Sequence, residues 1–174
     1  MFGDEEWDIT AKSGQKGLIY EAVDFLLQKA LKFHASSASV EDKMIVEGSF
    51  FEVYNEQVRD LMRKDPGNLS VMNNAKTGGV TIKELKTFKI ESVEDLRKIL
   101  ILGNSKRVKA STLKNKFSSR SHAIVQITVT TCTSLRNNKV KYNKGKLMMV
   151  DLAGSEKIDA FERHGKNKGT ILLL

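Results

Sequence analysis

Two short strings decide how this chain folds: Phe117-Ser118-Ser119-Arg120-Ser121-His122 and Val150-Asp151-Leu152-Ala153-Gly154-Ser155-Glu156. Each places small hydroxyl side chains or a glycine, together with charged groups, beside an apolar strand. Such residues make a poor hydrophobic core, but they suit loops that hold Mg²⁺ and contact the terminal phosphate of a nucleotide. The strings are one hairpin's length apart, so we expect them to form neighbouring loops at one edge of a sheet.

The composition is that of a single cytoplasmic domain. The chain has 174 residues and is 40% hydrophobic, which is enough for one core of its own. It has no run of about 18 apolar residues, and the acidic start Met1–Glu6 is unlike a signal peptide, so we expect no membrane partner. Cys132 is the only cysteine, and His34, His122 and His164 are too far apart for a zinc motif, so we expect no structural metal.

Positive charge is concentrated in the middle of the chain. The formal net charge is +8, and no acidic residue occurs between Asp95 and Asp151. The basic residues inside this interval are Arg97, Lys98, Lys106, Arg107, Lys109, Lys114, Lys116, Arg120, Arg136, Lys139, Lys141, Lys144 and Lys146. The distribution predicts contact with a polyanion, which could be nucleotide phosphate, an acidic protein surface or nucleic acid. A solvated basic face without a dedicated partner is an equal alternative.

Periodicity predicts two helices. Apolar residues at helical spacing indicate a helix over Gly17–His34. A second helix is expected to begin at Ser92-Val93-Glu94-Asp95, where a hydroxyl precedes an acidic first turn, and to continue to about Val108.

The first half of the chain also predicts a central strand and a hairpin. Met44–Tyr54 is rich in β-branched and aromatic residues, which is typical of a central strand. Asn55–Leu61 is expected to turn into a short helical segment that ends at Pro66-Gly67. Leu69–Met72 and Val80–Leu85 flank a glycine-containing loop and predict a hairpin with an exposed tip.

The second half predicts two more strands. Apolar and polar residues alternate over Val125–Thr130, which indicates a half-buried strand. Leu135–Lys144 is expected to be a polar return. Lys146–Val150 is a continuous apolar run of the kind found at the centre of a sheet, and it delivers Asp151 to the edge of that sheet.

Three segments together resemble the kinesin motor domain. Phe50–Leu61 is similar to the family pattern E-(I/V)-Y-N-E-x-(V/I)-x-D-L-L, although its Tyr54-Asn55-Glu56 is better explained as a strand-to-turn junction than as a substrate contact. Asn115–His122 matches N-x-x-S-S-R-S-H, the family's switch I, and Val150–Glu156 matches V-D-L-A-G-S-E, its switch II. The matches occur in family order, and the resemblance runs from about Gly17 to Glu156.

The resemblance implies an α/β fold. Residues 1–174 would form a single incomplete domain: part of a kinesin-type P-loop NTPase motor domain, with a central mixed β-sheet flanked by helices. Switch I would cover about residues 115–122 and switch II about residues 150–156. The domain would lack the P-loop and the C-terminal elements.

The resemblance also implies ATP and Mg²⁺ as ligands. Ser118 and Ser119 correspond to the switch I serines that reach Mg²⁺ and the γ-phosphate, and Asn115 to the residue that braces this loop and contacts nucleotide. Asp151 corresponds to the carboxylate that holds a Mg²⁺-bound water. Read singly, Ser-Ser could instead cap a helix or turn, and Asp151 could cap a strand end.

The catalytic group implied by the resemblance contains Arg120, Glu156 and Gly154. Gly154 corresponds to the residue whose backbone N–H senses the γ-phosphate. Arg120 and Glu156 correspond to an ion pair that closes switch I onto switch II around the attacking water. Read singly, Gly154 could be an ordinary turn, and the pair could be a surface contact worth less than about 1 kcal/mol.

The implied macromolecular partner is the microtubule. The family places microtubule contacts on the hairpin loop around Asn73–Gly79 and on the segment after switch II. The basic side chains at these positions, which we expect to meet the acidic surface of tubulin, are Lys76, Lys157, Arg163, Lys166 and Lys168. A nucleic-acid partner is disfavoured, because no recognised nucleic-acid-binding module accompanies the charge.

A P-loop of the form G-x-x-x-x-G-K-(S/T) is absent from the sequence. Its Gly-Lys pairs, Gly145-Lys146 and Gly165-Lys166, have Val140 and Ala160 where the first glycine should be. We therefore expect the chain to begin just after the P-loop of a complete domain, to stop before that domain's later elements, and to hydrolyse ATP very weakly or not at all by itself. The alternative function is a non-catalytic microtubule- or polyanion-binding module derived from a kinesin.

Overall fold

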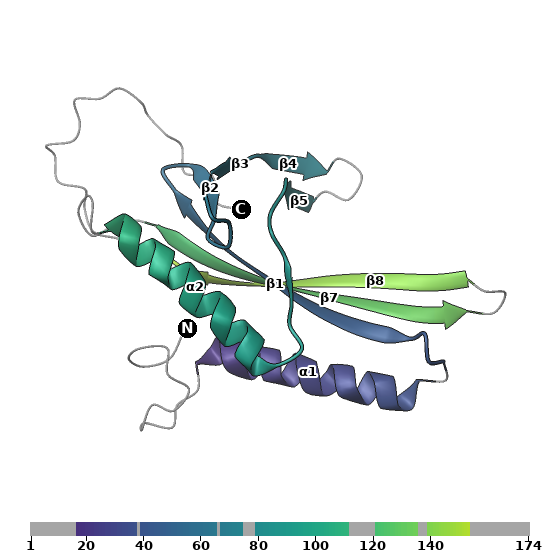
Figure 1. Cartoon of the computed structure of the whole chain (residues 1–174). Coiled ribbons are helices and arrows are strands. Elements are labelled where there is room, and N and C mark those ends of the chain that lie inside the picture. The colour runs from purple at the N-terminus through teal and green to yellow at the C-terminus, as the bar shows by residue number, and fades with distance from the viewer. Residues whose placement is uncertain are drawn as a thin grey trace, which may run out of the picture.

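The computed structural model describes residues 17–37, 39–65, 67–74, 79–111, 121–135 and 139–153 (Figure 1). In chain order, its helices and strands are α1 (Leu18–Ser36), β1 (Lys43–Tyr54), β2 (Gln57–Asp60), β3 (Asn68–Leu69), β4 (Val71–Asn74), β5 (Gly79–Ile82), β6 (Phe88–Lys89), α2 (Val93–Ser111), β7 (His122–Leu135) and β8 (Lys139–Asp151). No helix in these ranges is both long and apolar enough to cross a bilayer.

The strands form one large sheet and one small one. The large sheet has the order β3-β2-β1-β7-β8, with β6 also paired to β1, and the small sheet contains β4 and β5. Each pair of described strands in the large sheet is antiparallel. The prediction that Met44–Tyr54 forms a central strand is confirmed, because β1 has neighbours on both sides.

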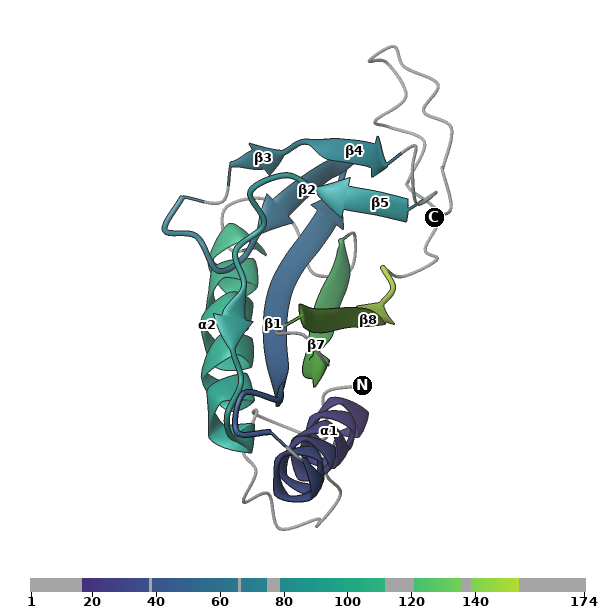
Figure 2. The same cartoon turned by 90° about the vertical axis from the view of Figure 1, so that its right-hand side faces the viewer.

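The two helices cover the same face of the large sheet (Figure 2). Side chains alternate along β1, so Val46 and Phe50 point into the core shared with α1 and α2. Phe51 points to the opposite face, where it packs in a smaller cluster with Ile124 and with Ile82 at the end of β5. The β4–β5 hairpin thus covers part of the face that the helices leave open.

Two glycines let the chain approach the core closely. A Cβ atom added at Gly103 of α2 would overlap the ring of Phe50, and one added at Gly48 of β1 would lie 2.7 Å from Cδ1 of Ile90. A larger residue at Gly103 would displace the Phe50 ring or move α2 away from β1, whereas one at Gly48 would require the end of the Ile90 side chain to shift. The Gly103 contact lets α2 lie close to β1.

Both predicted helices are confirmed. In α2 the predicted cap is also present, because the Asp95 N–H donates to Ser92 Oγ at 3.2 Å and the Ser92 N–H donates to Asp95 Oδ2 at 3.0 Å. The hydrogen bond from the Ser92 hydroxyl is the main cause that lowers the pKa of Asp95. This reciprocal arrangement satisfies donors at the helix start that would otherwise lack a partner.

The prediction of a helical segment over Asn55–Leu61 is wrong. The chain makes a tight hairpin there, and β2 returns antiparallel to β1 with Tyr54 opposite Gln57. The two turn residues, Asn55 and Glu56, have φ values of 47° and 60°. Positive φ at both central positions is typical of a type I′ turn, whose twist matches that of the flanking strands. This turn therefore returns the chain into the sheet.

The expectation of a polar return over Leu135–Lys144 is wrong in part, and Lys146–Val150 forms a strand that has a described neighbour on one side. Among the described strands, β8 lies at one edge of the large sheet and β3 at the other, and Leu147, Met148 and Val150 are exposed while Met149 is buried. The strand begins at Lys139, inside the predicted return, because β7 is long enough to pair with it from Leu135 back to Ala123. An apolar run alone does not distinguish a buried strand from an outer one.

The half-buried strand predicted around Val125–Thr130 is confirmed as part of β7. Val125 and Ile127 are fully buried, whereas Gln126 between them is half-buried. The hairpin predicted from Leu69 to Leu85 is likewise present as β4 and β5, paired from Val71–Ile82 to Asn74–Gly79. Its tip at residues 75–78 lies outside the described residues.

Candidate functional site

Of the predicted site residues, the structure describes Asp151. The others lie outside the described residues: Asn115, Ser118, Ser119, Arg120, Gly154 and Glu156 of the nucleotide site, and Lys76, Lys157, Arg163, Lys166 and Lys168 of the microtubule surface. The structure does describe the strand ends at which the first string ends and the second begins. These ends form the frame of the candidate site.

The first string ends, and the second begins, at adjacent positions of the sheet. The first string leads into β7 at His122, and β8 ends at Asp151, the second residue of the other string. Ala123 is the register partner of Asp151. Two residues beyond the end of β8, the Ala153 N–H donates a hydrogen bond to Nδ1 of His122 at 3.0 Å. The expectation that both strings meet at one sheet edge is therefore met where the structure describes them.

Three adjacent strands place two carboxylates on either side of a small residue. Glu52 of β1 pairs in register with Ala123 of β7, and Ala123 pairs with Asp151 of β8. Since partners in register point to the same face of a sheet, Glu52 and Asp151 flank the Ala123 methyl group. That face is the one covered by α2.

Arg107 of α2 lies over this row and contacts both carboxylates. Its Nε is 3.9 Å from Oε2 of Glu52, and its Nη1 is 3.9 Å from Oδ2 of Asp151. Its Nη2 also donates to Oγ of Ser121 at 3.4 Å. One guanidinium thus joins α2, the central strand, the end of the first string and the start of the second.

The burial of these groups differs in a way that bears on their roles. The side chains of Arg107 and Glu52 are 10% and 5% exposed, whereas that of Asp151 is 46% exposed. A carboxylate as buried as Glu52 is stable only with a cation nearby, and Arg107 supplies it. Asp151 is held from one side by the same cation and keeps an open side for a ligand.

The chemistry of Asp151 fits a magnesium site. Mg²⁺ is a hard cation that keeps several waters and binds proteins through one or two carboxylates. Asp151 offers one exposed carboxylate at a strand end, directly before the second string. Arg107 restrains its position without covering it.

Glu52 and Arg107 belong to the site, although the sequence does not predict them as members. In the sequence, Arg107 is one basic residue among many and Glu52 is one position of a strand. The signal that could have found Glu52 is its place on the face of β1 that also carries Val46 and Phe50, where a charge needs a partner.

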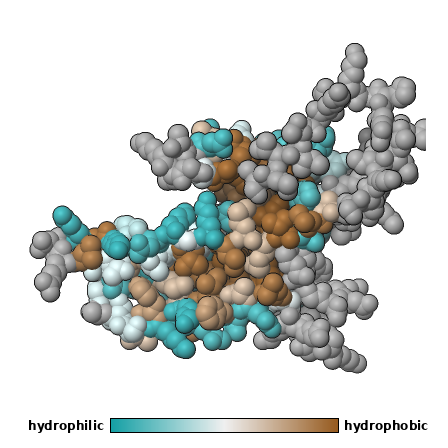
Figure 3. Space-filling model, turned by 180° about the vertical axis from the view of Figure 1, so that it is seen from behind, coloured by the Kyte–Doolittle hydropathy of each residue, from teal (hydrophilic) through white to brown (hydrophobic). Residues whose placement is uncertain are grey.

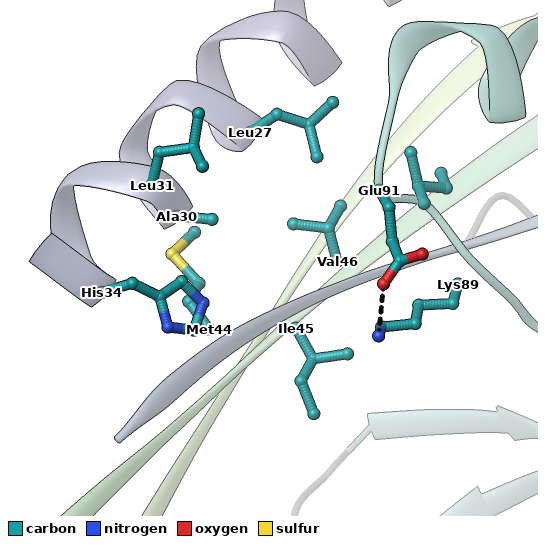
Figure 4. Close-up of a pocket in the computed structure, with 10 residues that line it drawn as sticks. Leu27, Ala30, Leu31, His34, Met44, Ile45, Val46, Lys89 and Glu91 are labelled. Atoms are coloured by element: carbon teal, nitrogen blue, oxygen red, sulfur yellow. Dashed lines mark hydrogen bonds and ion pairs between the residues drawn. The ribbon is translucent and has the colours of Figure 1, made fainter. Parts of the chain in front are cut away.

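A pocket elsewhere in the fold is not part of this site. It has a volume of about 250 Å³ and lies between the C-terminal half of α1 and the start of β1, with Leu31, His34 and Met44 among its lining residues (Figure 4). Met44 pairs with Thr131, at the end of β7 opposite to His122. Asp151, the predicted site residue that the structure describes, does not line this pocket.

Comparisons with known proteins agree with the resemblance. The family model "Kinesin motor domain" matches residues 1–170. "Kinesin-like protein KIF3C" from Bos taurus is 38% identical over 144 residues, which cover 82% of this chain and 17% of that protein. "Kinesin-like protein KIN-8B" from Arabidopsis thaliana is 39% identical over 116 residues, which cover 67% of this chain and 14% of that protein.

A solved structure described as "Structure of a fast kinesin: Implications for ATPase mechanism and interactions with microtubules" is similar in fold. Its TM-score is 0.72 at 30% sequence identity, covering 91% of this chain and 42% of that chain. The matched part of this chain spans 17% or less of the curated relatives named above. The predicted fold class, a partial kinesin-type motor domain, is confirmed, and the chain belongs to the kinesin motor domain family.

Proposed function

We propose that this chain forms the nucleotide-switch core of a cytoplasmic, microtubule-associated motor, in which ATP binding and hydrolysis by the complete domain drive movement along microtubules. The observation that carries the proposal is the register of Ala123 with Asp151, together with the bond from Ala153 to His122. This geometry places the end of the first string beside the start of the second. Loops that share one edge can close on one phosphate group.

The proposed ligands are ATP and Mg²⁺. Asn115, Ser118, Ser119 and Asp151 would contact the nucleotide and the ion, the ion partly through water. When bound, Mg²⁺ would neutralise charge on the β- and γ-phosphates. The residues of this chain would position the group that meets the ion. Arg107 already holds the Asp151 carboxylate at the end of β8, so binding of the ligand would not have to order this side chain.

The proposed catalytic group is Arg120, Glu156 and Gly154. The guanidinium of Arg120 and the carboxylate of Glu156 would close the two loops onto each other, and the Gly154 N–H would report the terminal phosphate. The start of β7 and the end of β8 lie beside one another, which supports this pairing. The microtubule surface would comprise Lys76, Lys157, Arg163, Lys166 and Lys168.

The 174 residues by themselves are proposed to be catalytically weak or inactive, because their sequence contains no G-x-x-x-x-G-K-(S/T). The same observation favours the second candidate function, a non-catalytic microtubule- or polyanion-binding module. Both candidates predict binding to microtubules that weakens as salt rises. They differ in whether the addition of a P-loop would restore nucleotide binding and hydrolysis.

The deciding experiment compares this chain with a longer protein in which a P-loop segment from a family member is fused upstream. We expect weak binding of a fluorescent ATP analogue by the chain alone, and Mg²⁺-dependent binding with microtubule-stimulated phosphate release by the fusion. A fusion that folds and binds microtubules but does not bind nucleotide would favour the non-catalytic module. If the affinity for microtubules did not fall as the salt concentration rises, the proposed electrostatic contact with the microtubule would be contradicted.

A further inference from the structure

His122 belongs to the first string and is not among the residues proposed to contact the nucleotide. It is the first residue of β7, and it is half-buried. Its backbone pairs in register with Val53 of the central strand, so its position in the sheet is fixed. Its Nδ1 accepts the hydrogen bond from the Ala153 N–H at 3.0 Å. A side chain of the first string is thus attached to the backbone of the second.

This hydrogen bond lies just beyond the last backbone pair of β7 and β8. That pair is Ala123 with Asp151, and β8 ends there. If the ladder continued, Ala153 would lie opposite Ser121. In the structure the acceptor of the Ala153 N–H is an imidazole. The chain can therefore leave the ladder after Asp151 and still be attached to the start of β7.

The direction of the bond fixes the form of the imidazole. A backbone N–H can only donate, so Nδ1 of His122 must offer a lone pair and the ring hydrogen must be on Nε2. Nδ1 is bonded to Cγ, so its position depends only on the χ1 and χ2 angles of a side chain whose backbone is paired in the sheet. The imidazole therefore offers the Ala153 N–H an acceptor at a nearly fixed point.

The second string is held from both faces of the sheet. Side chains alternate along β7, which puts Ala123 on the face covered by α2 and His122 on the opposite face. On the α2 face, Arg107 contacts Asp151. On the opposite face, His122 holds Ala153. The two contacts restrain neighbouring parts of the same segment, just before Gly154.

The surroundings of His122 favour its hydrogen bond. Val53, its register partner, packs in the small apolar cluster with Phe51 and Ile124 on the same face. Figure 3, which shows the molecule from behind, has hydrophobic side chains gathered over the middle of the molecule. A hydrogen bond in apolar surroundings is electrostatically stronger than one in water, and an N–H that loses its acceptor there is left unsatisfied.

We propose that His122 is a positioning residue that fixes the course of the second string as it leaves β8. Gly154 follows Ala153 directly in the sequence, so only the φ and ψ angles of Ala153 separate the attached N–H from the Gly154 N–H. The attachment would hold the Gly154 N–H where it can meet the terminal phosphate. This last step rests on the proposed function, whereas the attachment of Ala153 to His122 does not.

The attachment is tested on the whole chain without nucleotide. His122→Ala removes the acceptor, His122→Asn places an amide oxygen at the same distance along the side chain as Nδ1, and His122→Gln moves that oxygen one methylene further out. We expect hydrogen exchange at the Ala153 amide to be at least about tenfold faster in the Ala and Gln variants, and within about threefold of the unmodified rate in the Asn variant. Equal exchange in the unmodified chain and in His122→Ala would overturn the proposal.

The control substitution is His34→Ala, which removes an exposed imidazole at the end of α1. It should leave exchange at Ala153 unchanged. A rise in exchange equal to that of His122→Ala would mean that the effect is not specific to His122, and it would also overturn the proposal.

A measurement on the unmodified chain decides the matter if the variants unfold. Nitrogen-15 chemical shifts, recorded at about pH 8 where an ordinary imidazole is neutral, identify the ring nitrogen that carries the hydrogen. We expect this hydrogen on Nε2 of His122. A hydrogen on Nδ1 would overturn the proposal, because that nitrogen could not then accept the Ala153 N–H.

The consequence for catalysis is tested in the fusion that carries an upstream P-loop segment. We expect His122→Ala and His122→Gln to lower the kcat of microtubule-stimulated phosphate release at least about tenfold and to change the KM for ATP less than about twofold. His122→Asn should keep at least about a third of the unmodified kcat, since it retains an acceptor for Ala153. This split between kcat and KM, and the rescue by Asn alone, would not follow from a general loss of stability.

The outcomes separate the two proposals. An unmodified kcat in His122→Ala, together with faster exchange at Ala153, would overturn the role of His122 in positioning Gly154. An unmodified fusion that folds but binds no nucleotide would refute the proposed function instead. The exchange at Ala153 would still decide whether His122 holds the second string.

Discussion

Nη1 of Arg107 lies 3.9 Å from Oδ2 of Asp151, across a row of three strands that also brings Glu52 to the same guanidinium. Because Asp151 belongs to the second string and Ser121 to the first, this arginine contacts both. A shift of α2 would therefore change the contacts of Arg107 with both candidate loops. The arrangement joins the packing of the fold to the geometry of the candidate site.

The first prediction concerns the stability that Arg107 supplies. Arg107→Ala leaves the Glu52 carboxylate 5% exposed without a cation, and the loss of one partner of a buried pair is strongly destabilising. We expect a loss of about 3 kcal/mol in the free energy of unfolding, at the lower end for such pairs because neither contact is shorter than 3.9 Å. Urea unfolding followed by circular dichroism measures it.

The control for Arg107 is Lys98→Ala, which removes an exposed pair with Asp95 and should cost less than about 0.5 kcal/mol. Combining Arg107→Met with Glu52→Gln should recover part of the loss, since the uncompensated charge is then gone. An unfolding midpoint of Arg107→Ala equal to that of the unmodified chain would show that the guanidinium does not stabilise Glu52.

The second prediction uses two glycines with opposite surroundings. Gly103→Ala would drive a methyl group into the ring of Phe50, whereas Gly145→Ala on β8 meets no atom within 4 Å. We expect Gly103→Ala to destabilise the fold by about 1–3 kcal/mol and Gly145→Ala to change it by less than about 0.5 kcal/mol. Thermal and urea unfolding of the matched pair check this. Equal stability of the two variants would mean that α2 can move away from β1 without cost.

The third prediction is a pH dependence centred on Asp42. The Ser37 hydroxyl donates to its Oδ2 at 2.5 Å and the Ser134 N–H to its Oδ1 at 2.5 Å, and these bonds, the Ser37 bond first, lower the pKa of the carboxyl. A lowered pKa contributes stability above the unfolded pKa of about 4, and this stability is lost as pH falls through the folded pKa. The link ties the loop after α1 to the far end of β7.

Asp42→Asn should therefore be less stable than the unmodified chain at pH 7, and the difference should shrink as pH falls below about 4. Asp65→Asn, an exposed acid in the loop after β2, should show no such difference at either pH. Urea midpoints measured from about pH 7 to pH 3 would test it. A gap between Asp42→Asn and the unmodified chain that persists undiminished at the acid end would exclude Asp42 as its source.

The sequence predicts those elements of the fold that are determined by residues within the element itself. Helix α2 was predictable because Ser92 and Asp95 cap it locally, and β1 because its own residues favour a strand. The hairpin at Asn55-Glu56 was not predicted, because glutamate rarely adopts the positive φ that Glu56 has here. The exposure of β8 depends on which strands lie beside it, and its own residues do not encode that.

For the candidate site, the meeting of the two strings was predictable because a hairpin joins them, and the register of Ala123 with Asp151 agrees with it. The contact of Arg107 with Glu52 was not, because it links a helix and a strand that are distant in sequence and meet only in the folded core. The roles of Ser118, Ser119 and Asn115 stay predictions, since they lie outside the described residues.

The last prediction concerns the pair that would close the two loops. In a complete motor domain, Arg120→Ala or Glu156→Ala should preserve affinity for a fluorescent ATP analogue, because neither group is expected to hold the β-phosphate. Each should lower microtubule-stimulated phosphate release to about the basal rate, because the closed arrangement forms only when both charges are present. The charge-swapped double variant, Arg120→Glu with Glu156→Arg, should regain part of the stimulated rate if the attraction itself is what matters. Stimulated release at the unmodified rate in either single variant would remove the pair from the mechanism. Loss of nucleotide affinity in both would instead place the two side chains in binding, so the two failures are distinguishable.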